Sequence, residues 1–176
     1  EVKVSDAAKR MRVSTKSASR CFDELEYLNI DVLGMKGKSR VINIPNDRKQ
    51  VWQQIENVLR NPVIRRFVLR EDMKLEKKAG ISALCEYSLL SDNVYPTYAV
   101  TKKELKDSAV KVEKQVSELE EIGCVVLELG YFIDFLGKGF QDPLSVVLSL
   151  TGEEQEEERV DISINEMLEE YVWSKD

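Results

Sequence analysis

The sequence contains no histidine, and its three cysteines, Cys21, Cys85 and Cys124, lie far apart. Structural zinc sites are built from closely spaced cysteines and histidines, so a site of that kind is excluded. A Ser-His or Cys-His catalytic pair is excluded for the same reason. We therefore expect reduced thiols, no metal and no cofactor, and any enzyme chemistry would have to use carboxylates, lysines, tyrosines or hydroxyls.

Long apolar runs are also absent from the sequence. No segment approaches the roughly 18 uninterrupted apolar residues of a membrane-spanning helix. The first residues do not follow the basic, apolar and small-residue order of a secretory signal. These absences predict a cytoplasmic protein with no membrane partner.

The net charge of −6 is unevenly distributed along the 176 residues. Residues 1–78 hold 18 lysines and arginines against 11 acidic residues, a balance of +7, whereas residues 79–176 hold 8 against 21, a balance of −13. Such asymmetry is typical of a basic, nucleic-acid-facing module joined to an acidic domain. We predict an α+β protein with a first domain over 1–70, a linker over 71–78 and a smaller, acidic, mixed α/β domain over 79–176.

The stretch VSDAAKRMRVSTKSASRCFDELEYLNI, residues 4–30, has the pattern of two helices joined by a short turn. Ser5 is expected to cap a short first helix, and Ser14 to cap a longer second one by accepting a backbone N–H. On the second helix, apolar residues from Ala18 to Leu28 recur at spacings of three and four, which predicts one buried stripe. The opposite face carries mainly hydroxyl and basic side chains.

The next stretch, DVLGMKGKSRVINI, residues 31–44, predicts a β-hairpin. Two runs rich in β-branched residues flank a four-residue tip in which Gly37 can adopt positive φ. Ile42 and Ile44 are expected to share the inward face. Three basic side chains lie at or near the tip.

Together these patterns predict a surface that binds duplex DNA. In a helix-turn-helix the second helix lies in the major groove, where small hydroxyl and cationic side chains can donate to bases and phosphates. The hairpin would place further cations beside the phosphate backbone of the DNA. The predicted contact residues are Ser14, Thr15, Lys16, Ser17, Ser19 and Arg20 on the helix, with Lys36, Lys38 and Arg40 on the hairpin.

Residues 1–60 resemble the winged helix-turn-helix of bacterial MarR-like transcriptional regulators. The resemblance implies a groove-reading second helix, a wing that touches the DNA backbone, and a homodimer on pseudo-palindromic sites. The helix that usually precedes this core is not visible before Val4, so we expect that the chain has been cut upstream or that another segment replaces that helix.

The acidic half is more faintly similar to domains that follow winged helices in other regulators and to AbiEi-type antitoxins. The similarity lies in GISALCEYSLLSDNVYPTYAV and DPLSVVLSL. It implies an antitoxin-type autoregulator whose second domain neutralises a toxin. A small-molecule effector is the other expected partner.

Further elements are expected along the chain. They are a helix from Pro45-Asn46 to Leu59, a strand at VIRRFVLR, a helix after Gly80, an extended piece at YPTYAV, a Thr101/Glu104 capping box opening a helix with a heptad-like seam to Leu119, a buried strand at CVVLELGYFIDF, a helix after Asp142-Pro143, an acidic turn over 153–158 and an amphipathic helix from Val160 to Val172.

Two other interpretations stay open at this point. A metal-dependent nuclease would need clustered carboxylates, for which the candidates are Glu86, Asp92, Glu128 and Asp134, with Lys102 and Lys103 nearby. A sensor or interaction module would use aromatic side chains, for which the candidates are Trp52, Tyr87, Tyr131, Phe132, Phe135 and Trp173.

Overall fold

The computed structural model describes residues 1–45, 47–107, 122–131 and 139–174. The chain divides into two compact units, Glu1–Leu59 and Arg60–Asp176. The class is α+β, as predicted. The predicted boundary is wrong, because residues 60–70 and the proposed linker over 71–78 both belong to the second unit. The second unit is also the larger one, not the smaller.

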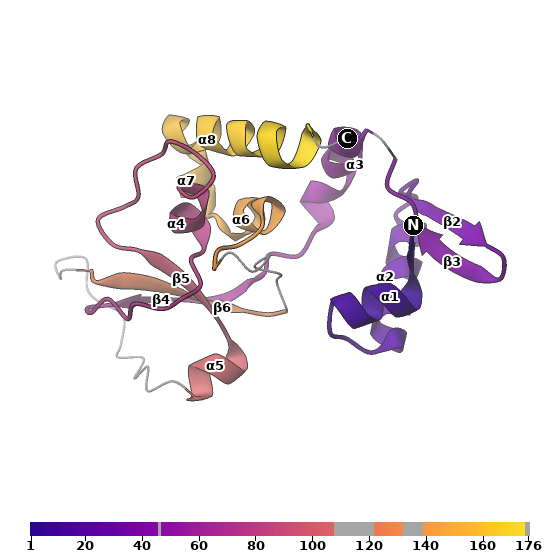
Figure 1. Ribbon diagram of the computed structural model, residues 1–176, viewed down its shortest axis with the longest axis horizontal. Helices are drawn as coiled ribbons and strands as arrows, with labels where there is room; N and C mark the ends of the chain where they lie inside the picture. The colour runs from indigo at the N-terminus through magenta and orange to yellow at the C-terminus, as the bar shows by residue number, and fades with distance from the viewer. Residues whose placement is uncertain (46, 108–121, 132–138, 175–176) are drawn as a thin grey trace. The chain divides into compact units, whose positions relative to one another are not determined.

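The first unit consists of a small sheet and short helices (Figure 1). A three-stranded antiparallel sheet has the order β1-β3-β2. The strands are β1 (Val2–Lys3), β2 (Leu33–Lys36) and β3 (Ser39–Ile42), and the helices are α1 (Val4–Arg10), α2 (Thr15–Tyr27), α3 (Arg48–Ile55) and the 3₁₀ turn η1 (Glu56–Val58). The hairpin predicted from the sequence is therefore present.

Helix α2 begins as expected. The Ser14 hydroxyl accepts the Ser17 N–H at 3.0 Å, which satisfies one of the free donors at the helix start. The turn before it contains Arg12 at φ 54°. Helix α1, by contrast, begins at Val4 with Lys3 as its N-cap, so the prediction that Ser5 caps it is wrong.

The core of the first unit is small, with the buried side chains Ala8, Ala18, Phe22, Ile30, Val32, Val41 and Trp52. On β3 the buried residue is Val41, at 1% exposure, whereas Ile44 is 63% exposed. Adjacent strand residues point to opposite faces, so a strand that buries Val41 leaves Ile42 only partly covered. The predicted inward pair, Ile42 and Ile44, is thus wrong.

Helix α3 begins later than expected. Asp47 is its N-cap and accepts the Gln50 N–H at 2.9 Å. The expected helix would bury one apolar side through Leu59, but Trp52 is buried whereas Val58 and Leu59 are exposed.

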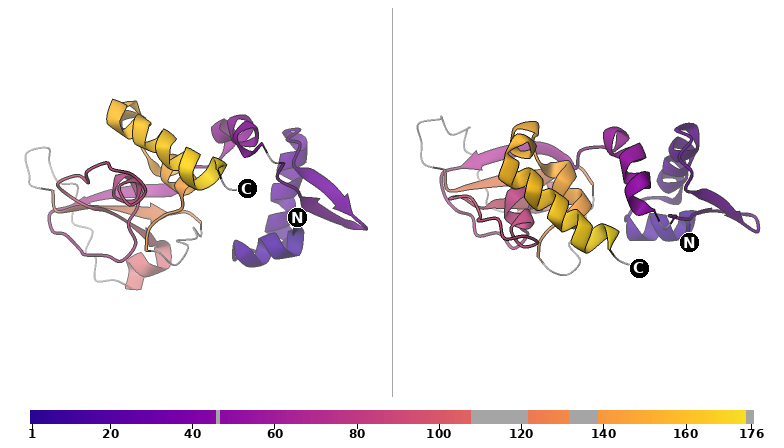
Figure 2. Two further views of the ribbon diagram at one scale, coloured as in Figure 1. Left: turned by 45° about the horizontal axis from the view of Figure 1, so that its top comes forward. Right: turned by 90° about the horizontal axis from the view of Figure 1, so that it is seen from above.

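The second unit is a mixed three-stranded sheet of order β4-β6-β5. The central strand pairs antiparallel with β4 and parallel with β5. Helices α4, α6, α7 and α8 lie on one side of the sheet and α5 on the other (Figures 1 and 2). The bounds are β4 (Val63–Leu69), α4 (Gly80–Leu84), β5 (Thr97–Thr101), α5 (Lys102–Asp107), β6 (Cys124–Leu129), α6 (Pro143–Ser149), α7 (Gly152–Glu156), α8 (Glu158–Leu168) and the π-helical turn η2 (Glu169–Trp173).

Every residue of β6 is buried, because this strand has a layer on each face. Val125 and Leu127 pack with Ala79 and Ala99 on one face. On the other, Cys124 and Val126 pack with Leu69, Tyr98 and Val100. A strand covered on both sides has a mainly apolar sequence, interrupted here by Glu128, which is why this strand was predictable. The strand ends at Leu129, earlier than the expected run to residue 135, of which 132–135 lie outside the described residues.

Several local predictions for the second unit are confirmed. The strand at VIRRFVLR is β4, and the caps at Asp142 and at Thr101 with Glu104 form as expected. The acidic segment over 153–158 was predicted to be a turn, but it contains helix α7 with a capping box between Thr151 and Glu154. Most of the heptad-like seam after Leu105 lies outside the described residues. None of the described helices has the length and apolar content to cross a membrane.

Candidate nucleic-acid interface

The predicted contact residues of α2 lie together on its first turns. Ser14, Thr15, Lys16, Ser17 and Arg20 are exposed, and Ser19 is half-buried. The Ser14 and Ser17 hydroxyls are 2.9 Å apart, so Ser14 serves mainly the helix cap. The ion pairs among the described residues include neither Lys16 nor Arg20, so both cations are available to an anionic ligand.

The basic character of this surface extends back along the chain. From Ala7 to Phe22 the sequence holds five cations and no acid. Lys9 and Arg10 lie in the last turn of α1, which packs against α2, and Arg12 lies in the turn between the helices. These three residues were not among the predicted contacts. The acid-free run was the signal that could have found them.

The hairpin tip presents two of the three predicted cations. Lys36 pairs with Ser39 at the end of the hairpin, so Gly37 and Lys38 form a two-residue connection. The first residue of such a connection has positive φ, and Gly37 has φ 64°. Lys38 is exposed next to it. Lys36 forms an ion pair with Glu1, but both side chains are about half exposed or more, at 62% and 48%, and such surface pairs contribute little to stability.

Arg40 is placed differently from the expectation. Its guanidinium donates to Asp23 at 2.6 Å, to Glu26 at 3.4 Å and to the Ser19 hydroxyl at 2.9 Å. The same group lies 5.9 Å from the centre of the Phe22 ring. Arg40 therefore faces the side of α2, within its own unit, rather than the solvent beyond the hairpin tip.

The revised boundary also changes the charge balance. Residues 1–59 hold 11 basic and 8 acidic side chains, a net +3 rather than the +7 of residues 1–78. Three of these acids, Glu1, Asp23 and Glu26, pair with Lys36 or Arg40. The longest stretch of the first unit with cations and no acidic residue remains residues 7–22, which cover the end of α1, the turn and the start of α2.

The three carboxylates of the alternative enzyme site that the structure describes do not form a cluster. Glu86 pairs with Lys78, and Asp92 accepts the Ser82 hydroxyl at 2.8 Å. The Glu128 carboxylate, at 2% exposure, accepts a hydrogen bond from the Arg65 Nε–H, and Asp134 lies outside the described residues. Within the described ranges no three acidic or cysteine side chains are grouped closely enough to hold a metal ion. Lys102 and Lys103 are exposed at the start of α5.

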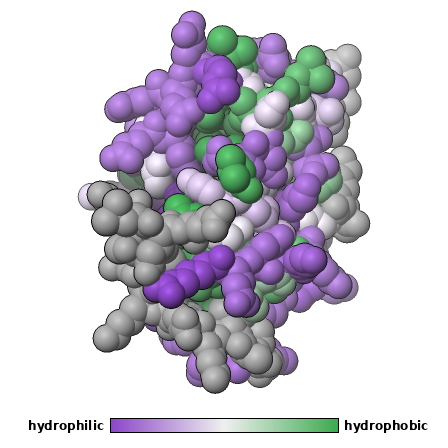
Figure 3. Space-filling view, turned by 90° about the vertical axis from the view of Figure 1, so that its left-hand side faces the viewer, coloured by the Kyte–Doolittle hydropathy of each residue, from purple (hydrophilic) through white to green (hydrophobic). Residues whose placement is uncertain are grey.

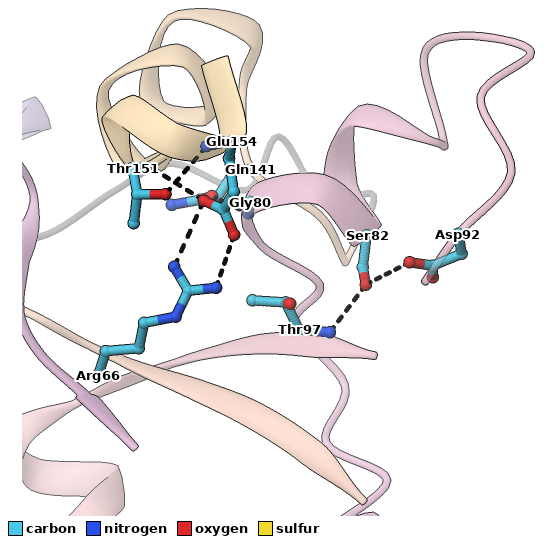
Figure 4. Close-up of polar contacts among 8 residues, drawn as sticks. All are labelled: Arg66, Gly80, Ser82, Asp92, Thr97, Gln141, Thr151 and Glu154. Atoms are coloured by element: carbon cyan, nitrogen blue, oxygen red, sulfur yellow. Dashed lines mark hydrogen bonds and ion pairs between the residues drawn. The ribbon is translucent and has the colours of Figure 1, made fainter. Parts of the chain in front are cut away.

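Polar side chains inside the second unit join its layers (Figure 4). Arg66 points from β4 toward α7, where it donates to Glu154 at 2.6 and 3.3 Å. Ser82 lies between Asp92 and Thr97, whose N–H it accepts at 2.7 Å. These contacts connect the helical layer and its loops to the sheet, so we assign them to the fold.

Of the four aromatic candidates that the structure describes, three belong to a hydrophobic core. Tyr87 contacts Phe140 and Tyr171 edge-on, with ring centres 5.1 and 5.0 Å apart, and its hydroxyl donates to the Gln141 carbonyl. Trp52 is buried, and Trp173 packs against the helical core. Tyr131 donates to the Arg60 carbonyl, and Phe132 and Phe135 lie outside the described residues.

One open cavity in the second unit has the volume of a small-molecule site. It measures about 310 Å³ and lies between segment 74–78 and the side chains of Tyr98 and Phe140. Ligand sites are usually lined by apolar groups. Lys74, Glu76, Lys78 and Glu86 all line this one, so its walls do not match that description.

The surface of the second unit exposes few large apolar side chains. Figure 3 shows the face that carries the segment between α4 and β5, where apolar groups are scattered among hydrophilic ones. Leu89 and Val94, in that segment, are 99% and 101% exposed. Single exposed apolar side chains are common on protein surfaces and do not define a site.

Comparisons with known protein families, with curated proteins and with solved structures find no match for the chain. The interpretation of the basic surface consequently depends on its geometry and charge.

Proposed function

We propose that the first unit binds duplex DNA, with α2 in the major groove and the β2–β3 hairpin beside the backbone, and that the protein is a sequence-specific transcriptional regulator. The observation that carries this proposal is the group of five cations, with no acidic residue among them, between Ala7 and Phe22, at the end of α1, in the turn and at the start of α2. A polyanion is the ligand such a surface attracts.

The shape of the unit supports the same ligand. The major groove is about 12 Å wide and admits one α-helix. The turn between α1 and α2 spans Met11 to Ser14, the length that helix-turn-helix motifs use. Small hydroxyl side chains at Thr15 and Ser17 allow the start of α2 to approach base edges closely, while Lys16 and Arg20 reach phosphates or guanines.

The arrangement favours a homodimer on DNA. Two recognition helices one helical turn apart read two half-sites, which one short helix cannot do. The partner-binding roles predicted for the second unit, toward an effector or a toxin, stay predictions.

The proposal is tested with a mobility-shift titration of the full chain on mixed-sequence duplex DNA at several salt concentrations. The double variant Lys16→Ala/Arg20→Ala should bind more weakly, with the slope of log K against log salt shallower by about 1.8, since each lost phosphate contact removes about 0.9. The matched control Lys102→Ala/Lys103→Ala removes the same charge from α5. Equal binding by the two variants would refute the proposal.

A further inference from the structure

Arg40 makes more polar contacts than any other contact residue predicted on the hairpin. Its partners Ser19, Asp23 and Glu26 are spaced by four and three residues along α2, so they follow one side of that helix. The residue itself belongs to β3, opposite Met35 of β2. One side chain therefore connects the hairpin to two successive turns of α2.

We infer that Arg40 is a positioning residue: it fixes the hairpin against α2 and does not contact phosphate. This inference rests on the proposed DNA-binding function, which it refines. A planar guanidinium can donate in several directions at once, so it holds both carboxylates and the hydroxyl in one geometry. An ammonium group at the same place would lack this fork.

The same contacts shield the DNA-binding surface from acidic charge. Asp23 and Glu26 are 59% and 71% exposed on the helix that is proposed to enter the groove. Unpaired, they would repel each other across one turn and repel the phosphates nearby. Paired with Arg40, the two carboxylates share one positive charge, so that the net charge of the group is −1 instead of −2, and they orient the hairpin.

Hydrogen exchange of the full-length protein without DNA tests the positioning role. Arg40→Gln should speed exchange of the β2–β3 amides about three- to tenfold, the change expected from losing one or two exposed ion pairs, and leave the α1 amides unchanged. Asp23→Asn/Glu26→Gln should do the same although Arg40 is retained. Lys38→Gln, which removes a neighbouring cation, should not. Wild-type exchange in the first two variants would overturn the inference.

The salt dependence of binding to a mixed-sequence duplex tests the absence of a phosphate contact. The variant Asp23→Asn/Glu26→Gln/Arg40→Gln removes Arg40 together with the acids that would otherwise repel DNA. The log–log slope of Lys38→Gln should be shallower than that of the wild type by about 0.9. Adding Lys38→Gln to the triple variant, so that a displaced Lys38 cannot account for a change, should leave the slope equal to that of Lys38→Gln alone. A further loss of about 0.9 would show that Arg40 touches phosphate and would overturn the inference.

The two parts separate failure of the inference from failure of the proposed function. A wild-type protein that binds no duplex refutes the proposed function. The exchange experiment then still decides whether Arg40 holds the hairpin. The variant Arg40→Lys guards against misfolding, because it keeps the charge and should give intermediate exchange.

Discussion

Gln141 offers a test of how the second unit is held together. Its side chain is 0% exposed, and the oxygen and the nitrogen of its amide form hydrogen bonds to different helices. The Oε1 atom accepts the N–H of Gly80, at the start of α4, at 2.9 Å, and the Nε2 group donates to the Ser149 hydroxyl, at the end of α6, at 3.0 Å. Replacing Gln141 with Leu keeps a side chain of similar size but removes both bonds.

The expected loss follows from these partners. The Gly80 N–H would be left buried without an acceptor, which costs about 1–3 kcal/mol, and the bond to Ser149 contributes about 1 kcal/mol. Ser149 itself still donates to the Ser145 carbonyl. Gln141→Leu should therefore lower the free energy of unfolding by about 2–4 kcal/mol.

The assay is urea denaturation followed by tryptophan fluorescence in a Trp52→Phe background, so that Trp173 reports on the second unit. The control is Gln155→Leu, because the Gln155 amide donates to the Val147 carbonyl from an exposed position, where water can replace it. That variant should lose less than about 1 kcal/mol. The reasoning is refuted if the two variants differ by less than about 0.5 kcal/mol.

Two further predictions concern titratable groups. Burial alone would raise the pKa of the Glu154 carboxyl, but hydrogen bonds from Arg66 and the Thr151 backbone outweigh it and hold the pKa below the ordinary value of 4.5. A carboxyl whose pKa is lowered on folding stabilises the fold at pH values above its ordinary pKa. This contribution is lost as the pH falls through the lowered pKa. As the pH is lowered below about 4.5, the Tm of Glu154→Gln should accordingly fall less than the Tm of the wild type. An equal fall in Tm for the two proteins would contradict the assignment. Burial, followed by the nearby Asp92 charge, raises the pKa of the Cys85 thiol to about 11, and burial raises the pKa of Cys124. Because the thiolate is the reactive form, iodoacetamide at about pH 8 should modify the exposed Cys21 first, as peptide mass mapping would show. Faster labelling of Cys85 or Cys124 would refute this order.

Local features of the sequence determined much of the secondary structure. The caps at Ser14, Asp142 and Thr101 each act within three residues of the chain, so the pattern and the contact are the same information. The apolar run of β6 and the glycine at the hairpin tip were equally direct. The predicted contact residues of α2 follow from the same local spacing.

The tertiary structure decided which side chains meet across the chain. Arg40 and Asp23 are 17 residues apart, Gln141 and Gly80 are 61 apart, and Arg66 and Glu154 are 88 apart. The sequence around each of these residues does not predict which distant residue it contacts. The domain boundary and the buried face of β3 were missed for the same reason. Short-range hydrogen bonds can be predicted from neighbouring residues, because donor and acceptor lie within a few positions. Burial and long-range pairing depend on how the elements pack.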